Sequence, residues 1–133
     1  MHTGETDKIY QIQFDSQNQW VTMLWEGYVS SIDFREGTEM MLNLLIENRT
    51  SKVLANIKDM LLIDKEDQQW LQNYFLPRAM RFGFRTLAIV KPTSYFNLAA
   101  IEEISTGIRE KEFKIELFDS VKDAQNWLSR ELI

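Results

Sequence analysis

The sequence predicts an α/β domain built around a mostly parallel sheet. Strand-like and helix-like stretches alternate along the chain. Two of the strand-like stretches, at 52–57 and 86–90, are almost continuously apolar, as in strands buried on both faces of a parallel sheet. A chain of 133 residues suits one domain and is too short for two ordinary ones. We therefore treat residues 1–133 as a single domain.

An antiparallel hairpin is expected near the N-terminus, after a loose tail at residues 1–7. Tyr10, Ile12 and Phe14 alternate with glutamines, which is the period of a half-buried strand. A short polar run then separates this stretch from a second strand at 20–25. Two strands joined by a short polar turn predict a hairpin at one edge of the sheet.

The first helix is predicted from about Phe34 to Asn48, after a starting segment at 30–33. Its run at 40–46 is apolar over more than one stripe. A helix of this kind must be covered on two sides, so we expect the sheet on one side and a second partner on the other. The strand at 52–57 follows it.

The second helix is expected to begin at Asp64, because Asp67 stands three residues later, in a spacing like that of a capping box. Gly83 ends the helical pattern. Pro77 lies inside it and should kink the helix or split it in two.

The C-terminal half continues the alternation. A strand at 86–90 precedes a third helix that Thr93 or Ser94 caps, and a last strand at 113–117 precedes a helix that begins at Ser120. The order is ββαβαβαβα. It predicts a four- to five-stranded, mostly parallel sheet with an N-terminal antiparallel hairpin and four helices packed on it.

The composition excludes several classes of protein. The formal net charge of −5 argues against a general nucleic-acid binder, which usually carries a basic surplus. No stretch approaches the roughly 18 apolar residues of a membrane span, and the N-terminus does not resemble a signal peptide. There are no cysteines, so disulfides and thiol chemistry are excluded. We expect a cytoplasmic protein.

No catalytic, metal-binding or cofactor-binding pattern stands out. The single histidine, His2, lies in the tail, and the glycines form no phosphate-binding loop. Asp64, Glu66 and Asp67 cluster in sequence, but helix capping and the helix dipole explain them more simply than a metal site does. The sequence therefore predicts neither an enzyme nor a bound cofactor or metal.

The sheet edge after the strands is the predicted partner or ligand site. Ligands of open parallel sheets bind outside the carboxyl ends of the strands. The connection at 60–63 is apolar, and it either packs back over the sheet as core or forms an exposed surface for a partner or ligand. The predicted rim comprises Lys58, Asp59, Met60, Leu61, Leu62, Ile63, Asp64, Lys91, Thr93, Ser94 and Tyr95.

An aromatic stripe supplies a second candidate site. Trp70, Tyr74 and Phe75 recur at helical spacing. Such a stripe is more often core than pocket, although it could line an apolar pocket.

Several short strings in this order resemble one family. They are Trp-Glu-Gly at 25–27, Lys-Val-Leu-Ala-Asn at 52–56, Trp70 with Leu-Pro-Arg at 76–78, Leu-Ala-Ile-Val at 87–90, and the ending Phe118-Asp119, Ala124 and Trp127-Leu128. Over about residues 8–132 the chain resembles the SpoIIAA-like branch of the STAS-type superfamily. These are small bacterial α/β proteins related in fold to CRAL-TRIO lipid-transfer domains.

What the resemblance implies is a non-enzymatic regulatory or protein-interaction domain. In some STAS domains a serine just after the third strand, at a helix start, is phosphorylated as a switch. Here residues 52–85 contain no serine or threonine, and Asp64 heads the helix instead. We therefore expect a protein partner, which could be a second copy of the chain, and no phosphoserine switch. The alternative is a domain that binds a small apolar or lipid-like ligand.

Overall fold

The computed structural model describes residues 10–61, 63–108 and 112–131. The tail predicted at 1–7 lies outside these residues. The elements are β1 (Tyr10–Asp15), β2 (Trp20–Gly27), α1 (Ser31–Glu47), β3 (Lys52–Met60), α2 (Lys65–Trp70), the π-helical turn η2 (Leu71–Phe75), α3 (Leu76–Arg81), β4 (Thr86–Val90), α4 (Tyr95–Gly107), β5 (Lys114–Phe118) and α5 (Val121–Arg130).

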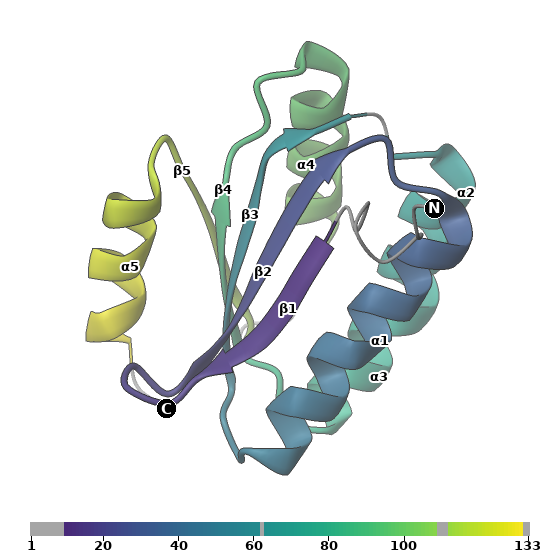
Figure 1. The fold of residues 1–133 in the computed structure, drawn as a ribbon. Helices are drawn as coiled ribbons and strands as arrows, with labels where there is room; N and C mark the ends of the chain where they lie inside the picture. Colours follow the sequence, from purple (N-terminus) through teal and green to yellow (C-terminus); the bar gives the residue numbers. More distant parts are fainter. Residues whose placement is uncertain (1–9, 62, 109–111, 132–133) are drawn as a thin grey trace, which may run out of the picture.

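The five strands form one sheet in the order β1-β2-β3-β4-β5, so each strand lies beside the strand that precedes it in the chain. β1 and β2 pair antiparallel, and every other pair is parallel. Figure 1 shows the hairpin at one edge of the sheet and β5 at the other. The predicted α/β class, element order and N-terminal hairpin are confirmed.

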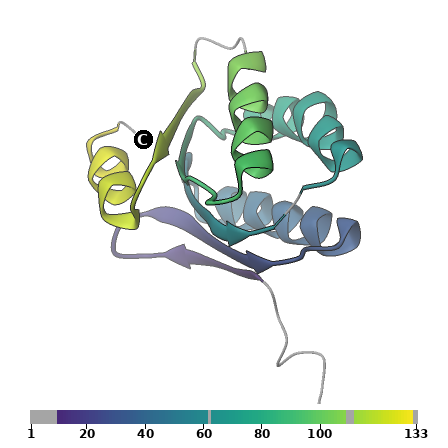
Figure 2. The same cartoon turned by 90° about the horizontal axis from the view of Figure 1, so that it is seen from above.

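The helices cover the two faces of the sheet unequally. α1, the segment from α2 to α3, and α4 lie on one face, while α5 alone lies on the other (Figure 2). The larger hydrophobic core lies under the first group and includes Trp25, Phe34 and Phe75. A smaller core lies under α5 and includes Trp20 and Leu128. Because burial of apolar area drives folding, the first face carries most of the stabilisation.

Pro77 accounts for the interruption of the second helix. It lies in the first turn of α3, directly after the wider turn η2. Proline lacks an amide hydrogen and its ring crowds the carbonyl four residues earlier, so a regular α-helix does not continue through it. The prediction that Pro77 kinks or splits this helix is confirmed.

The apolar run at 40–46 is covered on one side only. Met41, Leu42 and Leu45 are buried in the core, whereas Met40 and Ile46 are 40% and 41% exposed. The second cover that we expected for α1 is therefore not provided by the described part of the chain. Cover of this side of α1 by a partner stays a prediction.

Candidate functional site

The carboxyl ends of the parallel strands meet at the upper edge of the sheet in Figure 1. The connections that follow the strands are tied together there by hydrogen bonds. The Leu61 amide donates to the Gly27 carbonyl at 2.9 Å, so the ends of β2 and β3 are joined. The Thr93 amide and hydroxyl both donate to the Lys58 carbonyl, at 3.1 and 3.2 Å, and join the end of β4 to β3.

β3 is longer than predicted, so three of the predicted rim residues belong to the strand and not to the connection after it. Lys58, Asp59 and Met60 are strand residues, because β3 continues to pair with β2 up to Met60. The strand was predicted to end at Ile57, and the error arose because the polar pair at 58 and 59 resembles the start of a loop. Both side chains of that pair are exposed at the strand end.

A buried asparagine fixes the connection after β3. Asn97, in the first turn of α4, is fully buried. Its Nδ2 donates to the carbonyls of Met60, at 2.9 Å, and Leu61, and its Oδ1 accepts from the Ile63 amide at 2.9 Å. A buried backbone group without a partner is costly, so these bonds allow an irregular segment to lie against the core.

The two interpretations of residues 60–63 apply to different residues. Met60 and Ile63 are buried in the core, whereas Leu61 is 52% exposed. Leu62 lies outside the described residues. Asn97 therefore holds Met60 and Ile63 inward while Leu61 faces solvent.

Two further apolar side chains are exposed at the same end of the molecule. Tyr28, directly after β2, is 62% exposed, and Ile32, in the first turn of α1, is 78% exposed. Single exposed apolar side chains are common, but here Tyr28 and Leu61 directly follow strand ends that the Leu61–Gly27 hydrogen bond joins, and Ile32 comes four residues after Tyr28. We call Tyr28, Ile32 and Leu61 the strand-end patch. Sequence reasoning missed Tyr28 and Ile32, because nothing in the pattern separates them from core positions.

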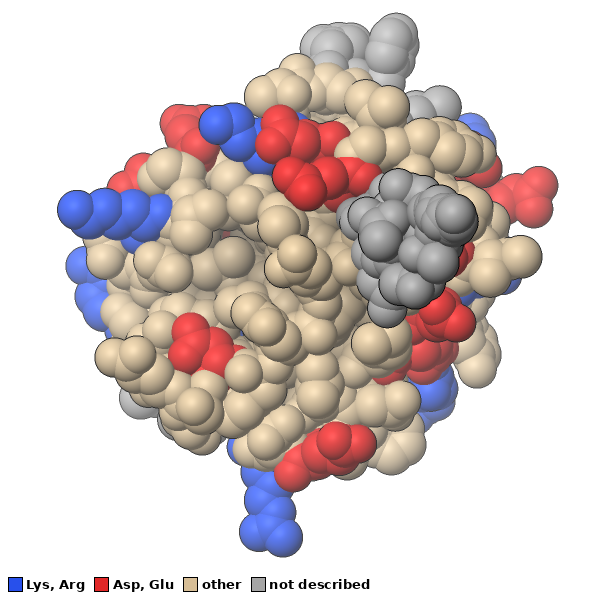
Figure 3. Space-filling view, in the orientation of Figure 1, with Lys and Arg blue, Asp and Glu red and all other residues tan. Residues whose placement is uncertain are grey.

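Carboxylates flank the strand-end patch along the chain. Glu26 and Asp59 stand opposite one another across the β2–β3 pair, and both are exposed. Asp33, Asp64 and Glu66 lie on the segments that follow β2 and β3. Two basic residues, Lys58 near the end of β3 and Lys65 at the start of α2, belong to the same part of the chain. Figure 3 shows acidic side chains in the upper part of this face, next to a basic one, and further acidic side chains at its right and in its lower part.

The remaining predicted rim residues follow the end of β4. Lys91 forms an ion pair with Asp119 at 2.8 Å, and this hydrogen bond raises the pKa of the Lys91 ammonium. Ser94 occupies the N-cap position of α4 without a side-chain capping bond, and Tyr95 is the first residue of that helix. The ion pair is exposed, so its contribution to stability is small.

The predicted capping box at Asp64 and Asp67 was wrong. Asp64 has the backbone conformation of an N-cap, but its side chain makes no capping bond. Asp67 is buried and points to α1 instead, where it accepts hydrogen bonds from the Ser31 hydroxyl at 2.6 Å and from Arg35 Nε at 3.0 Å. The Arg35 guanidinium also lies 5.2 Å from the centre of the Trp70 ring. Asp67 thus joins two helices, a role that spacing within one helix cannot reveal.

Within the described ranges, no three Asp, Glu or His side chains converge as metal ligands would. None of the described helices is long and apolar enough to cross a lipid bilayer.

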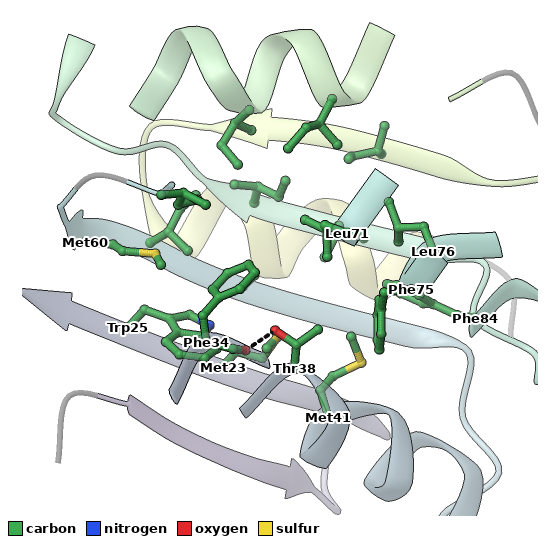
Figure 4. A pocket seen from close by; sticks show the side chains of 18 residues that line it. Met23, Trp25, Phe34, Thr38, Met41, Met60, Leu71, Phe75, Leu76 and Phe84 are labelled. Carbon is green, nitrogen blue, oxygen red and sulfur yellow. Dashed lines mark hydrogen bonds between the residues drawn. The ribbon is translucent and has the colours of Figure 1, made fainter. Parts of the chain in front are cut away.

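An apolar cavity of about 80 Å³ lies between the sheet and the helices α1, α3 and α4 (Figure 4). Its walls include Met23, Trp25, Phe34, Met60 and Phe75. The only hydroxyl on its wall belongs to Thr38, and this hydroxyl donates to the Phe34 carbonyl at 2.7 Å. A cavity with no free polar group stays dry.

Of the three aromatic residues predicted for an apolar pocket, only Phe75 lines the cavity. Tyr74 is 54% exposed on the outer side of the turn η2. Trp70 packs against Phe34 and Phe75, with ring centroids 6.3 and 5.4 Å away, and does not reach the cavity. The Trp70 and Tyr74 rings also lie close together, with centroids 6.2 Å apart, so the three aromatic residues stay in contact although only Phe75 reaches the cavity.

Comparison of the sequence with protein-family models and with curated proteins finds no match. Among solved structures, the fold is similar to the crystal structure of an uncharacterized protein of the DUF3478 family, with a SpoIIAA-like fold, from Shewanella loihica. The TM-score is 0.59 at 16% sequence identity, and the match covers 90% of this chain and 91% of the other. The chain therefore has the SpoIIAA-like fold that its sequence predicted.

Proposed function

We propose that this chain is a non-enzymatic regulatory domain that binds a protein partner through the strand-end patch. The observation that carries the proposal is the exposure of Tyr28, Ile32 and Leu61 on neighbouring segments at one end of the sheet. A group of exposed apolar side chains costs solubility, and a binding partner is its usual explanation.

Three polar side chains at this end of the molecule support binding rather than catalysis. The Asn97 amide bonds to the backbone of Met60, Leu61 and Ile63. Lys91 is paired with Asp119, and Asp67 is held by Ser31 and Arg35. A general acid or base needs a free, positioned group in reach of a substrate, and these groups are committed to structural bonds.

We further propose that partner binding does not depend on phosphorylation at the start of α2. Residues 52–85 contain no serine or threonine, so the position after β3 has no hydroxyl to modify. The carboxylates of Asp64 and Glu66 give this helix start a fixed negative charge, where a phosphoserine would supply a reversible one.

Two matched isoleucines on α1 test the proposal. Ile32 and Ile46 are both exposed, one in the first turn beside the patch and the other in the last turn at the opposite end of the helix. We expect Ile32→Ser to release the partner and Ile46→Ser to retain it, in quantitative affinity purification from the organism that encodes the chain. Equal recovery with both variants would refute the strand-end patch as the binding surface. Thermal unfolding checks that both variants fold.

The internal cavity favours a second candidate function, which is binding of a small apolar ligand. About 80 Å³ is roughly half the 150 Å³ of an engineered cavity that binds benzene, so an acyl chain does not fit without rearrangement. If the chain binds such a ligand, native mass spectrometry of the purified chain should reveal a bound small molecule. Detection of the bare chain mass alone would exclude this alternative.

A further inference from the structure

We infer that the partner presents a cationic amphipathic segment to the strand-end patch, an inference that rests on the proposed function. Such a segment would place apolar side chains against Tyr28, Ile32 and Leu61 and place Lys or Arg side chains against the surrounding carboxylates. Recognition of an amphipathic segment by an apolar surface with a charged border is a recurring mode of protein binding.

The charge around the patch is the first argument. The segments 26–33 and 58–66 contain five carboxylates and only two lysines, a net charge of −3 out of −5 for the whole chain. A partner of positive charge is therefore attracted to this end of the molecule, which raises the rate of association as well as specificity.

The placement of two of these carboxylates is the second argument. Glu26 and Asp59 are direct neighbours on adjacent parallel strands, and both are exposed. A cationic side chain seated between them would be attracted to both carboxylates at once. The pair therefore gives a cation a preferred position beside Leu61, two residues after Asp59.

Other occupants of the surface fit less well. Two copies of this chain would bring two acidic borders together, and an anionic lipid surface would be repelled by the same charge. A metal ion is not the counter-charge, because the described carboxylates at this end do not converge in groups of three. A cationic protein segment satisfies both the apolar and the acidic parts of the surface.

The test uses two synthetic helical peptides of equal length, one built from leucine and lysine and the other from leucine and glutamate. Binding of each labelled peptide to the full chain is measured by fluorescence anisotropy. We expect the lysine peptide to bind, the glutamate peptide not to bind, and added salt to weaken binding. Glu26→Gln with Asp59→Asn should weaken binding of the lysine peptide about tenfold.

Two controls separate specific binding from general attraction to an acidic protein. Glu47→Gln with Glu103→Gln removes the same charge from exposed sites away from the patch, and this variant should bind the lysine peptide nearly as well as the unaltered chain. Ile32→Ser should weaken binding, and Ile46→Ser should not.

Failure of the charge inference can be distinguished from failure of the proposed function. Equal binding of the two peptides, or equal weakening by both double variants, would overturn the inference about charge. If Ile32→Ser nevertheless released the natural partner and Ile46→Ser did not, the proposed function would stand with a partner of different chemistry.

Discussion

Gly37 of α1 lies against the indole ring of Trp25 of β2. A Cβ atom on Gly37 would stand 2.5 Å from Trp25 Cη2, closer than two carbon atoms can approach. The Trp25 ring cannot easily move aside, because it is buried between the rings of Tyr10 and Phe34, whose centroids lie 5.0 and 5.7 Å away. The absence of a side chain at position 37 thus sets how closely α1 approaches the sheet.

Gly37→Ala should destabilise the protein, although alanine is the better helix former. The propensity gain is about 1 kcal/mol, whereas forcing a methyl group into a packed core costs roughly 1–3 kcal/mol. Urea unfolding gives the free energy of each variant. Gly107→Ala is the matched control, because the atom its Cβ would meet is the end of the half-exposed Gln72 side chain, which can move. A stability gain in both variants would contradict the close packing of α1.

Arg49→Gly should stabilise the protein by about 1 kcal/mol. α1 ends in a Schellman motif, in which the Arg49 amide donates to the Ile46 carbonyl at 3.2 Å and the Thr50 amide donates to the Leu45 carbonyl at 3.1 Å. Arg49 adopts the left-handed conformation that this motif requires, with φ at 52°. Glycine takes that conformation without steric cost. Arg49→Ala is the control in thermal unfolding, since it removes the charge but keeps the Cβ atom and should not stabilise.

Asn97→Asp should destabilise the connection after β3 more than any exposed asparagine variant. A carboxylate cannot donate, so the carbonyls of Met60 and Leu61 would lose their donor and face a negative charge. We expect a loss of roughly 2–3 kcal/mol, together with faster hydrogen exchange at the Ile63 amide. Asn43→Asp, on the exposed face of α1, should change stability little. Similar losses for both variants would argue against the role assigned to Asn97.

Ionisation of the Tyr10 hydroxyl should lower the free energy of unfolding at high pH. Burial, followed by the hydrogen bond that its hydroxyl donates to Glu36 at 2.8 Å, raises the pKa of Tyr10 from 10.0 to about 12. A raised pKa means that the folded state holds this proton more tightly than the unfolded state does. The stabilisation is therefore complete below pH 10 and is lost as pH rises through about 12. Ultraviolet titration should show Tyr10 ionising late, and Glu36→Gln should lower its pKa.

The order of elements could be predicted from the sequence because it depends on periodicity alone. Continuous apolar runs, as at 52–57 and 86–90, indicate strands buried on both faces. Alternation, as at Tyr10, Ile12 and Phe14, indicates a strand buried on one face. Neither pattern depends on knowing the distant contacts. The end of β3 was misplaced because pairing with β2 overrides the polar character of Lys58 and Asp59.

The candidate site could be predicted only in its location. That it lies at the carboxyl ends of the strands follows from the parallel sheet. Its apolar members, Tyr28 and Ile32, were missed because exposure depends on which segments cover a position. Asn97 offered a signal, since it stands four residues before Ile101 on the buried stripe of α4, where a polar residue requires partners.

The strand order has a consequence for how the chain is made. Each strand pairs with its immediate predecessor, so the sheet can grow by one strand at a time as the polypeptide leaves the ribosome. No completed strand has to wait for a partner from the far end of the chain, although the last helix must arrive before the face under α5 is shielded. Until α5 packs on the sheet, Trp20 and Leu54 stay open to chaperones and to aggregation.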